Sequence, residues 1–212
     1  MYYKIKEDGI FKIDLGTFWD SGECVGIFKM TEWDNEKILW EKCGIWHTVD
    51  EIHFCKMESH RDFLYGTFQM PAKEYGKKDE LFAIYILKDR VIILSDDDSI
   101  DKNIIKISGH AIAKDYSLER FIYDFFMSFI EDELLFLQKI EHKITGIEEQ
   151  VMKEQSDKFN IGLLKLKKII ARFYHYYTQL AEAGDELAGN EEEFFTEETV
   201  ELFKMYSEKM TR

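Results

Sequence analysis

Three side chains that can bind soft metals alternate along one short segment of the sequence. His53, Cys55 and Met57 are each separated by one residue, and alternate residues of a β-strand point to the same face. Imidazole, thiolate and thioether groups are ligands for zinc or copper. The spacing matches no familiar zinc motif, and cysteine and methionine are common in protein cores. We therefore favour a core role for Cys55 and Met57.

Acidic side chains form three further clusters. Hard divalent cations such as Mg²⁺ bind carboxylate oxygens and keep several of their waters. Aspartate is also common in turns and at helix ends, and a run of charge usually marks a solvated helix face. We favour these structural roles for the individual residues of the clusters, which occupy positions 96–98, 131–133 and 191–193.

Other signals argue against an enzyme and against several kinds of partner. The sequence contains no GxSxG, P-loop, GxGxxG or HExxH motif, so no familiar catalytic site is predicted. A formal net charge of -14 disfavours nucleic acid and anionic lipid surfaces as partners. Three cysteines without a CxxC pair fit a reducing compartment. The longest apolar run, residues 121–130, is too short to span a bilayer.

The first half of the chain has the pattern of strands with a few helices. The last two apolar runs are separated only by residues 88–90, which predicts a central hairpin covered on both faces. Helices are expected over residues 35–43 and 99–112. Residues 1–115 are thus predicted to form an α/β domain, a mixed β-sheet layered with helices. The expected strands cover residues 2–5, 10–13, 24–30, 52–57, 63–70, 81–87 and 91–94.

The second half has a heptad pattern, which predicts long helices. Residues 117–154 are expected to form one helix, although Glu133 interrupts its apolar positions. A short polar link leads to a second helix of matched length, so residues 116–190 are predicted to be a long antiparallel αα-hairpin. The apolar positions of the second helix alternate in steps of four and three: Phe159, Leu163, Leu166, Ile170, Phe173, Tyr177, Leu180 and Leu187.

A third helix is expected within residues 191–212. Ser117 is suited to cap the first helix and Thr196 to cap the third. The last residues carry no glycine or proline that would end a helix. We therefore expect the natural chain to continue beyond Arg212.

This organisation resembles the CorA family of metal-ion transporters. The resemblance rests on residues 63–70 (FLYGTFQM), residues 80–87 followed by 90–95, residues 121–135 continuing to 149, and residues 193–198 before the last helix. It implies an α/β domain, two long "willow" helices and the start of a stalk helix that leads to membrane spans. The pore signature Gly-Met-Asn and both spans are absent from the sequence, so the membrane would be reached only through missing C-terminal helices.

The resemblance also implies a function and a site. Asp50 and Glu51 look like the acidic pair that holds a regulatory divalent ion against a neighbouring stalk. A solvated helix terminus is the competing interpretation of this pair. The family relationship implies Mg²⁺, or Co²⁺ or Zn²⁺ in a related transporter, a homopentamer, and a cytoplasmic sensor domain of a plasma-membrane protein. The alternative is a soluble scaffold that binds helical partners through the hairpin.

Overall fold

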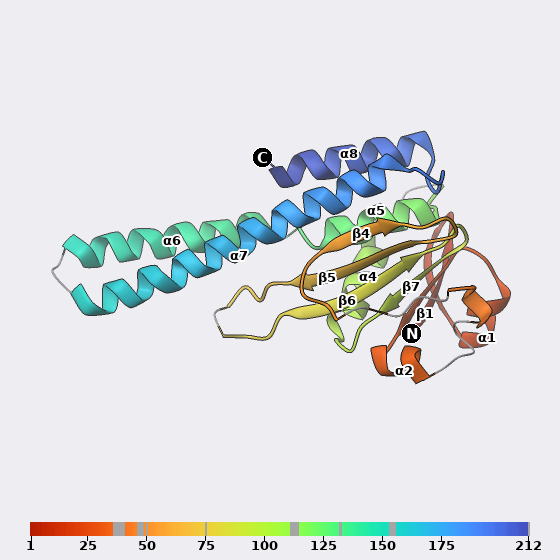
Figure 1. Ribbon diagram of the computed structural model, residues 1–212, viewed down its shortest axis with the longest axis horizontal. Helices are drawn as coiled ribbons and strands as arrows, with labels where there is room; N and C mark the ends of the chain where they lie inside the picture. Colours follow the sequence, from red (N-terminus) through yellow and green to blue (C-terminus); the bar gives the residue numbers. More distant parts are fainter. Residues whose placement is uncertain are drawn as a thin grey trace.

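A mixed β-sheet lies at one end of the molecule, and a pair of long helices extends away from it (Figure 1). The computed structural model describes residues 1–35, 41–45, 49, 51–74, 76–110, 115–131, 133–152 and 156–211. Within these residues, seven strands form one sheet: β1 (Tyr2–Lys6), β2 (Gly9–Ile13), β3 (Cys24–Phe28), β4 (Lys56–Ser59), β5 (Leu64–Met70), β6 (Glu80–Ile86) and β7 (Arg90–Leu94).

The predicted central hairpin is confirmed. The strand order is β2-β1-β3-β7-β6-β5-β4, so β7 is the middle strand and β6 lies beside it. β3 and β7 pair in parallel, with Val25 opposite Val91. The other neighbouring pairs are antiparallel. Both β6 and β7 are buried along nearly their whole length, as expected of strands covered on two faces.

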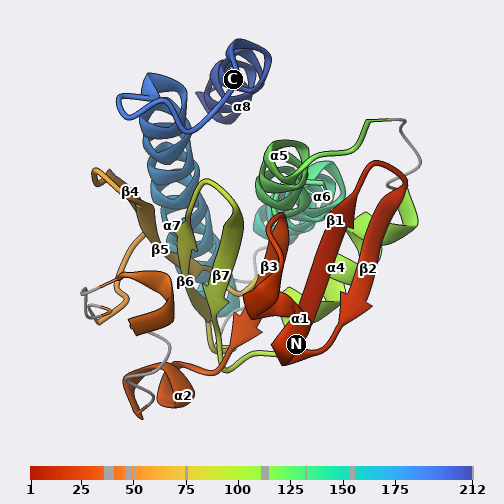
Figure 2. The same cartoon turned by 90° about the vertical axis from the view of Figure 1, so that its right-hand side faces the viewer.

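The two faces of the sheet carry separate cores. Successive residues of a strand point to opposite faces, so Phe82 and Ile84 of β6 pack on the helical side while Tyr85 joins the other core. Helices α4 (Ser99–His110) and α5 (Leu118–Ser128) lie on the first side (Figure 2). Short helices α1 (Leu15–Asp20) and α2 (Met30–Asn35) contribute Phe18 and Trp33 to the second core.

In this half, helices α1 and α2 were not expected, and one strand is shorter than predicted. The strand predicted over residues 52–57 begins only at Lys56, because the backbone N–H of Cys55 donates to the side chain of Gln179 at 2.9 Å rather than to a neighbouring strand. The helix predicted over residues 35–43 falls largely on residues 36–40, which are outside the described part of the chain. The prediction over residues 99–112 is confirmed through His110.

The prediction of one helix over residues 117–154 is wrong. Helix α5, capped by Ser117 as expected, ends at Ser128, and α6 (Glu133–Met152) begins after a turn. Phe125 and Phe126 pack on the sheet, with ring centroids 5.8 Å from Phe82 and 5.4 Å from Phe68 respectively. The break lets the chain leave the sheet once these rings are buried. The interruption of the apolar pattern at Glu133 was the sequence signal for it.

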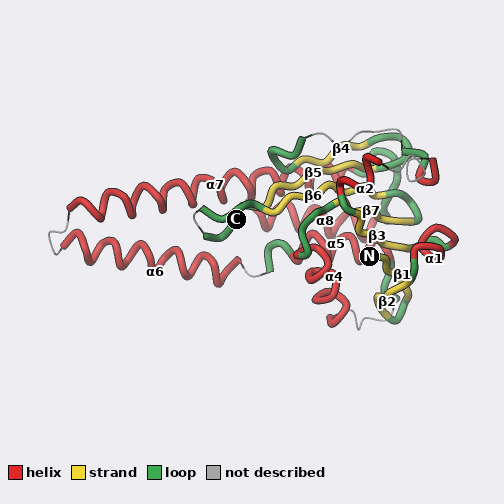
Figure 3. The backbone as a smooth tube through the Cα atoms, turned by 90° about the horizontal axis from the view of Figure 1, so that it is seen from below, coloured by secondary structure: helices red, strands yellow, loops and turns green. Residues whose placement is uncertain are grey.

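The hairpin of α6 and α7 (Ser156–Gly189) is present, and it extends beyond the sheet (Figure 3). Its helices are unequal, with 20 and 34 residues, or about 30 and 51 Å at 1.5 Å per residue. Leu166 and every seventh residue after it are buried on α7, as the predicted seam requires. The buried residues between them lie one position earlier than predicted. This buried stripe consists of Leu166, Ile169, Phe173, Tyr176, Leu180, Ala183 and Leu187.

Helix α8 (Glu197–Thr211) packs on α7. It lies along the C-terminal half of α7 and runs in the opposite direction to α7 (Figure 1). Phe203 and Tyr206 of α8 are fully buried, and Gly184 of α7 lies against Tyr206. Two sides of α7 are therefore occupied here, one by β4 of the sheet and the other by α8. The third predicted helix is confirmed.

Candidate functional site

The predicted acidic pair is described only in part, since Asp50 lies outside the described residues. The resemblance implied that this acidic pair lies on a helix of the α/β domain. Glu51 instead lies in an irregular segment before β4. Its side chain is 87% exposed, and one carboxylate oxygen lies 3.5 Å from Nε2 of His53, which is 64% exposed. An exposed pair of this kind contributes little to stability. The Glu51 carboxylate is therefore open to a hydrated cation.

The alternating residues His53, Cys55 and Met57 do not form a metal site. Cys55 and Met57 are buried, whereas His53 is exposed. The Cys55 thiol donates to the backbone carbonyl of Gln69 at 3.6 Å, and burial raises the pKa of this thiol to about 12. A neutral thiol is a poor metal ligand. Within the described part of the chain, no group of three His, Cys, Asp or Glu side chains could hold a metal ion.

The described residues of the acidic clusters lie in turns and on solvated surfaces, as we expected. The carboxylates of residues 96–98 are exposed in the turn before α4, where Asp97 N donates to Ser95 Oγ at 3.1 Å. Glu131 forms an ion pair with Lys106 at 2.7 Å. Residues 191–193 are exposed in the turn before α8. That turn is stabilised by Asn190, whose side chain bonds both N and O of Phe195.

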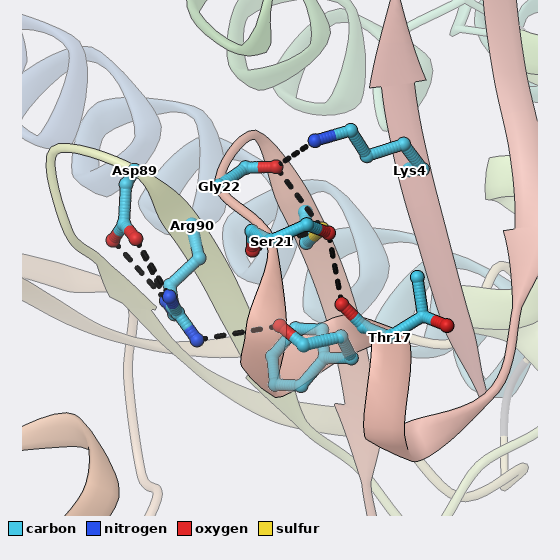
Figure 4. Close-up of polar contacts among 8 residues, drawn as sticks. Lys4, Thr17, Ser21, Gly22, Asp89 and Arg90 are labelled. Carbon is cyan, nitrogen blue, oxygen red and sulfur yellow. Dashed lines mark hydrogen bonds and ion pairs between the residues drawn. The ribbon is translucent and has the colours of Figure 1, made fainter.

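A polar cluster around Arg90 was not predicted (Figure 4). The guanidinium group pairs with Asp89 at 2.6 Å and donates to the carbonyl of Phe18 at 3.3 Å. It also lies 5.6 Å from the Phe18 ring centroid and 5.9 Å from that of Trp19. Hydrogen bonds to Asp89 raise the pKa of Arg90 further, so it is always charged. The cluster fixes α1 against the start of β7 and has a structural role.

A second unpredicted contact joins the sheet to the hairpin. Asp79, in the loop between β5 and β6, accepts hydrogen bonds from the N–H of Ala72 at 3.0 Å, from Gln69 at 2.8 Å and from Arg172 of α7. Partial burial alone would raise the pKa of Asp79, but these hydrogen bonds and the Arg172 charge outweigh it and lower the pKa. The loop is thus held against α7 by a charged carboxylate.

The start of α8 is attached to α5 as well as to α7. Thr196, which was expected to cap α8, donates from both N and Oγ1 to the Glu119 carboxylate at 2.9 and 2.8 Å. Neighbouring aromatic rings pack beside this contact, with Phe195 and Phe203 centroids 5.2 Å apart. No sequence pattern indicated the Glu119 contact, because 77 residues separate its partners. Helix α8 is therefore anchored to α5 as well as to α7.

Comparisons with known proteins agree with this arrangement. The family model described as "CorA-like Mg2+ transporter protein" matches residues 42–212. The soluble domain of CorA from Methanocaldococcus jannaschii has a similar fold, with a TM-score of 0.74 and 16% identity over 100% of this chain and 88% of that one. The complete CorA magnesium transporter from that organism gives a TM-score of 0.78 and 17% identity over 100% of this chain and 70% of its own.

A third similar structure is the ZntB cytoplasmic domain from Vibrio parahaemolyticus, with a TM-score of 0.66 and 10% identity over 99% of this chain and 93% of that chain. No curated protein matches the sequence. Identities this low establish a shared fold only. The family match, however, covers most of the chain, and this chain therefore belongs to the CorA-like Mg²⁺ transporter family.

We expected the membrane-spanning helices to lie in sequence that follows this chain. In the stretches of chain with a described structure, every helix is too short or too polar to cross a bilayer. The long helix α7 reaches 34 residues, but lysine, arginine and acidic side chains occur along its whole length.

Proposed function

We propose that this chain is the cytoplasmic part of a plasma-membrane transporter for Mg²⁺ or a related divalent cation, and that it senses the transported ion. The observation that carries the proposal is the family match over residues 42–212. In this proposal the membrane spans and the pore belong to further sequence of the full-length protein. The chain itself regulates transport and catalyses no reaction.

The packing of α8 supplies a physical route from the sensor to the membrane. Helix α8 packs on α7 where Tyr206 lies against Gly184 and on α5 where Phe203 lies 6.1 Å from Phe126, measured between ring centroids. Its first residues are bound to Glu119 of α5. The loop that holds Asp79 links α7 to the sheet. A displacement of the sheet relative to a neighbouring subunit would therefore move α7 and α8 together, and any helix that continues α8 would move with them.

The proposed sensor uses charge. We place a regulatory ion at Asp50 and Glu51, completed by a carboxylate of a neighbouring subunit in a homopentamer. With a formal charge of -14 on each chain, neighbouring subunits repel, and a bound divalent ion reduces this repulsion and favours the closed ring. Self-association is further supported by four apolar side chains of α7 that are exposed in the single chain: Ile161, Leu164, Ile170 and Tyr174.

The same exposed side chains favour the second candidate, a soluble scaffold that binds helical partners. The reading frame beyond Arg212 distinguishes the two. Two apolar segments of about twenty residues each, enough to span a bilayer, with Gly-Met-Asn between them support the transporter. A stop codon directly after Arg212 supports the scaffold. The choice between Mg²⁺ and a zinc or cobalt substrate is tested by titrating each ion.

The sensor role is tested by a Mg²⁺ titration followed by thermal unfolding. At ten times the dissociation constant, ion binding adds about 1.4 kcal/mol to the free energy of unfolding. For a chain of this size that raises the melting temperature by about 3–6 °C. The rise should disappear in the double variant Asp50→Ala/Glu51→Ala.

A matched control removes two other exposed carboxylates. Asp96→Ala/Asp97→Ala changes the net charge equally but should keep the full stabilisation by Mg²⁺. Equal loss in both double variants would indicate general charge screening and refute a specific site. No rise in the parent chain would refute a site contained within residues 1–212.

A further inference from the structure

A cavity of about 380 Å³ lies where the loop between β5 and β6, the end of α5 and the middle of α7 meet. This volume falls in the range of small-molecule binding sites. The cavity is not part of the predicted ion site, since neither Glu51 nor its neighbours line it. Its walls are formed by Met70 to Glu74, Lys77, Lys78, Glu80, Asn103, Ser128, Phe129, Phe173 and Tyr176.

Part of the cavity wall is aromatic. Phe129, Phe173 and Tyr176 line the cavity and are otherwise packed into the core, each no more than 8% exposed. Aromatic walls of this kind bind planar rings through offset or edge-to-face contacts. Asn103 and Ser128 also line the cavity, and their amide and hydroxyl groups can bond the polar edge of such a ring.

The lining also carries a small excess of positive charge. Lys73, Lys77 and Lys78 line the cavity from the β5–β6 loop, together with Glu74 and Glu80. Within this loop Glu74 pairs with Lys77 at 2.8 Å. The Lys77 contact lowers the pKa of Glu74 most, with smaller contributions from two lysines of α6. Three ammonium groups and two carboxylates therefore line the cavity, and Lys139 and Lys143 of α6 add positive charge near Glu74.

This concentration of positive charge is unusual in a chain with a net charge of -14. At physiological ionic strength, charges more than about 8–10 Å away are largely screened. An anion inside the cavity would therefore respond to the nearby lysines more than to the acidic remainder of the molecule. Flexible ammonium groups are common ligands for phosphate.

The loop that carries Lys73, Lys77 and Lys78 is also held at both of its ends before any ligand arrives. Asp79, at the end of the loop, accepts hydrogen bonds from Ala72 N, Gln69 and Arg172. Lys73 lies 5.8 Å from the ring centroid of Phe136 on α6. A loop that is already ordered loses less conformational entropy on binding.

We propose that this cavity binds a nucleotide, with its phosphate held by Lys73, Lys77 and Lys78 and its base against Phe129, Phe173 and Tyr176. The end of α5 agrees with this orientation. Its last carbonyl groups carry partial negative charge, and Ser128 and Phe129 at this end line the cavity, so the phosphate belongs at the loop and the amino-bearing edge of a base belongs near α5. The inference does not depend on the proposed transport function.

The test is calorimetric titration of the whole chain with adenosine monophosphate in the absence of divalent cations. We expect saturable binding that weakens as salt is raised, because ion pairs with phosphate are screened. The double variant Lys73→Gln/Lys78→Gln should bind at least about tenfold more weakly, equivalent to about 1.4 kcal/mol. Unchanged affinity in this variant, or no binding by the parent chain at millimolar nucleotide, overturns the proposal.

Two controls separate the parts of the site. Lys204→Gln removes one exposed lysine on α8, which pairs with Glu201 at 2.6 Å, and should leave nucleotide affinity unchanged. Inorganic phosphate should bind more weakly than adenosine monophosphate, because it has no ring to place against the aromatic wall. Equal affinities for the two ligands would overturn the nucleotide assignment. Since Mg²⁺ is omitted throughout, failure here leaves the ion-sensing test unaffected.

Discussion

Gly184 is the position at which the packing of α8 on α7 is most tightly constrained. A Cβ atom at Gly184 would lie 2.8 Å from Cδ1 of Tyr206 and 3.4 Å from the backbone Cα of Ser207. The Tyr206 ring is fully buried and Ser207 is 6% exposed, so neither group can move aside without disturbing the contact between the two helices. We predict that Gly184→Ala destabilises the protein.

The magnitude follows from two opposing effects. Replacing glycine by alanine inside a helix gains about 1 kcal/mol of helix propensity. Inserting a methyl group into a packed interior costs about 1–3 kcal/mol. The net change is a loss of about 0–2 kcal/mol for Gly184→Ala.

Gly146 provides the matched control, because it lies inside α6 and a Cβ there would meet no atom within 4 Å. Gly146→Ala should therefore only gain helix propensity, which stabilises the protein by about 1 kcal/mol. Urea unfolding of both variants should therefore place them about 1–3 kcal/mol apart, with opposite effects on stability. In thermal unfolding each kcal/mol should move the midpoint by about 2–4 °C for a chain of this size.

An equal rise in stability for the two variants would refute this reasoning. It would mean that Tyr206 and Ser207 move away at no cost, so that α8 is not closely packed on α7. The proposed mechanical link between the hairpin and the continuation of α8 would then lose its structural basis.

Two further predictions concern buried polar groups. The hydroxyl of Tyr206 is buried and forms no hydrogen bond with any residue that the structure describes, so Tyr206→Phe should keep or raise stability in urea. By contrast, Tyr116→Phe removes a 3.1 Å hydrogen bond to Asp124 and should cost about 0.5–1.5 kcal/mol; a larger loss for Tyr206→Phe would contradict this. The lowered pKa of Asp79 means that its contribution to stability is complete above its usual pKa of 3.8 and is lost as pH falls through the lower folded value. When the pH is lowered from neutral to below about 4, the Asp79→Asn variant should lose less stability than the parent. Thermal unfolding across that range measures this difference, and identical pH profiles would show that the carboxylate is not held as described.

The sequence determined the kinds of elements and their order. Apolar runs such as residues 81–87 and 91–94 could only be central strands, because their lack of polar residues requires cover on both faces. The three-and-four spacing of residues such as Leu166, Phe173 and Leu180 required a long helix with one apolar stripe. Both are local patterns, so no tertiary information was needed. The Ser117 cap was predictable for the same reason.

The tertiary structure decided what each surface packs against. The buried stripe of α7 lies at Ile169 and Tyr176 rather than at Ile170 and Tyr177, a choice that heptad spacing cannot express. The long first helix broke after Ser128 because its phenylalanines had to stay on the sheet. The pairs Glu119–Thr196 and Asp79–Arg172 join residues 77 and 93 positions apart. Contacts between such distant residues follow from the folded chain and leave no periodic trace in the sequence.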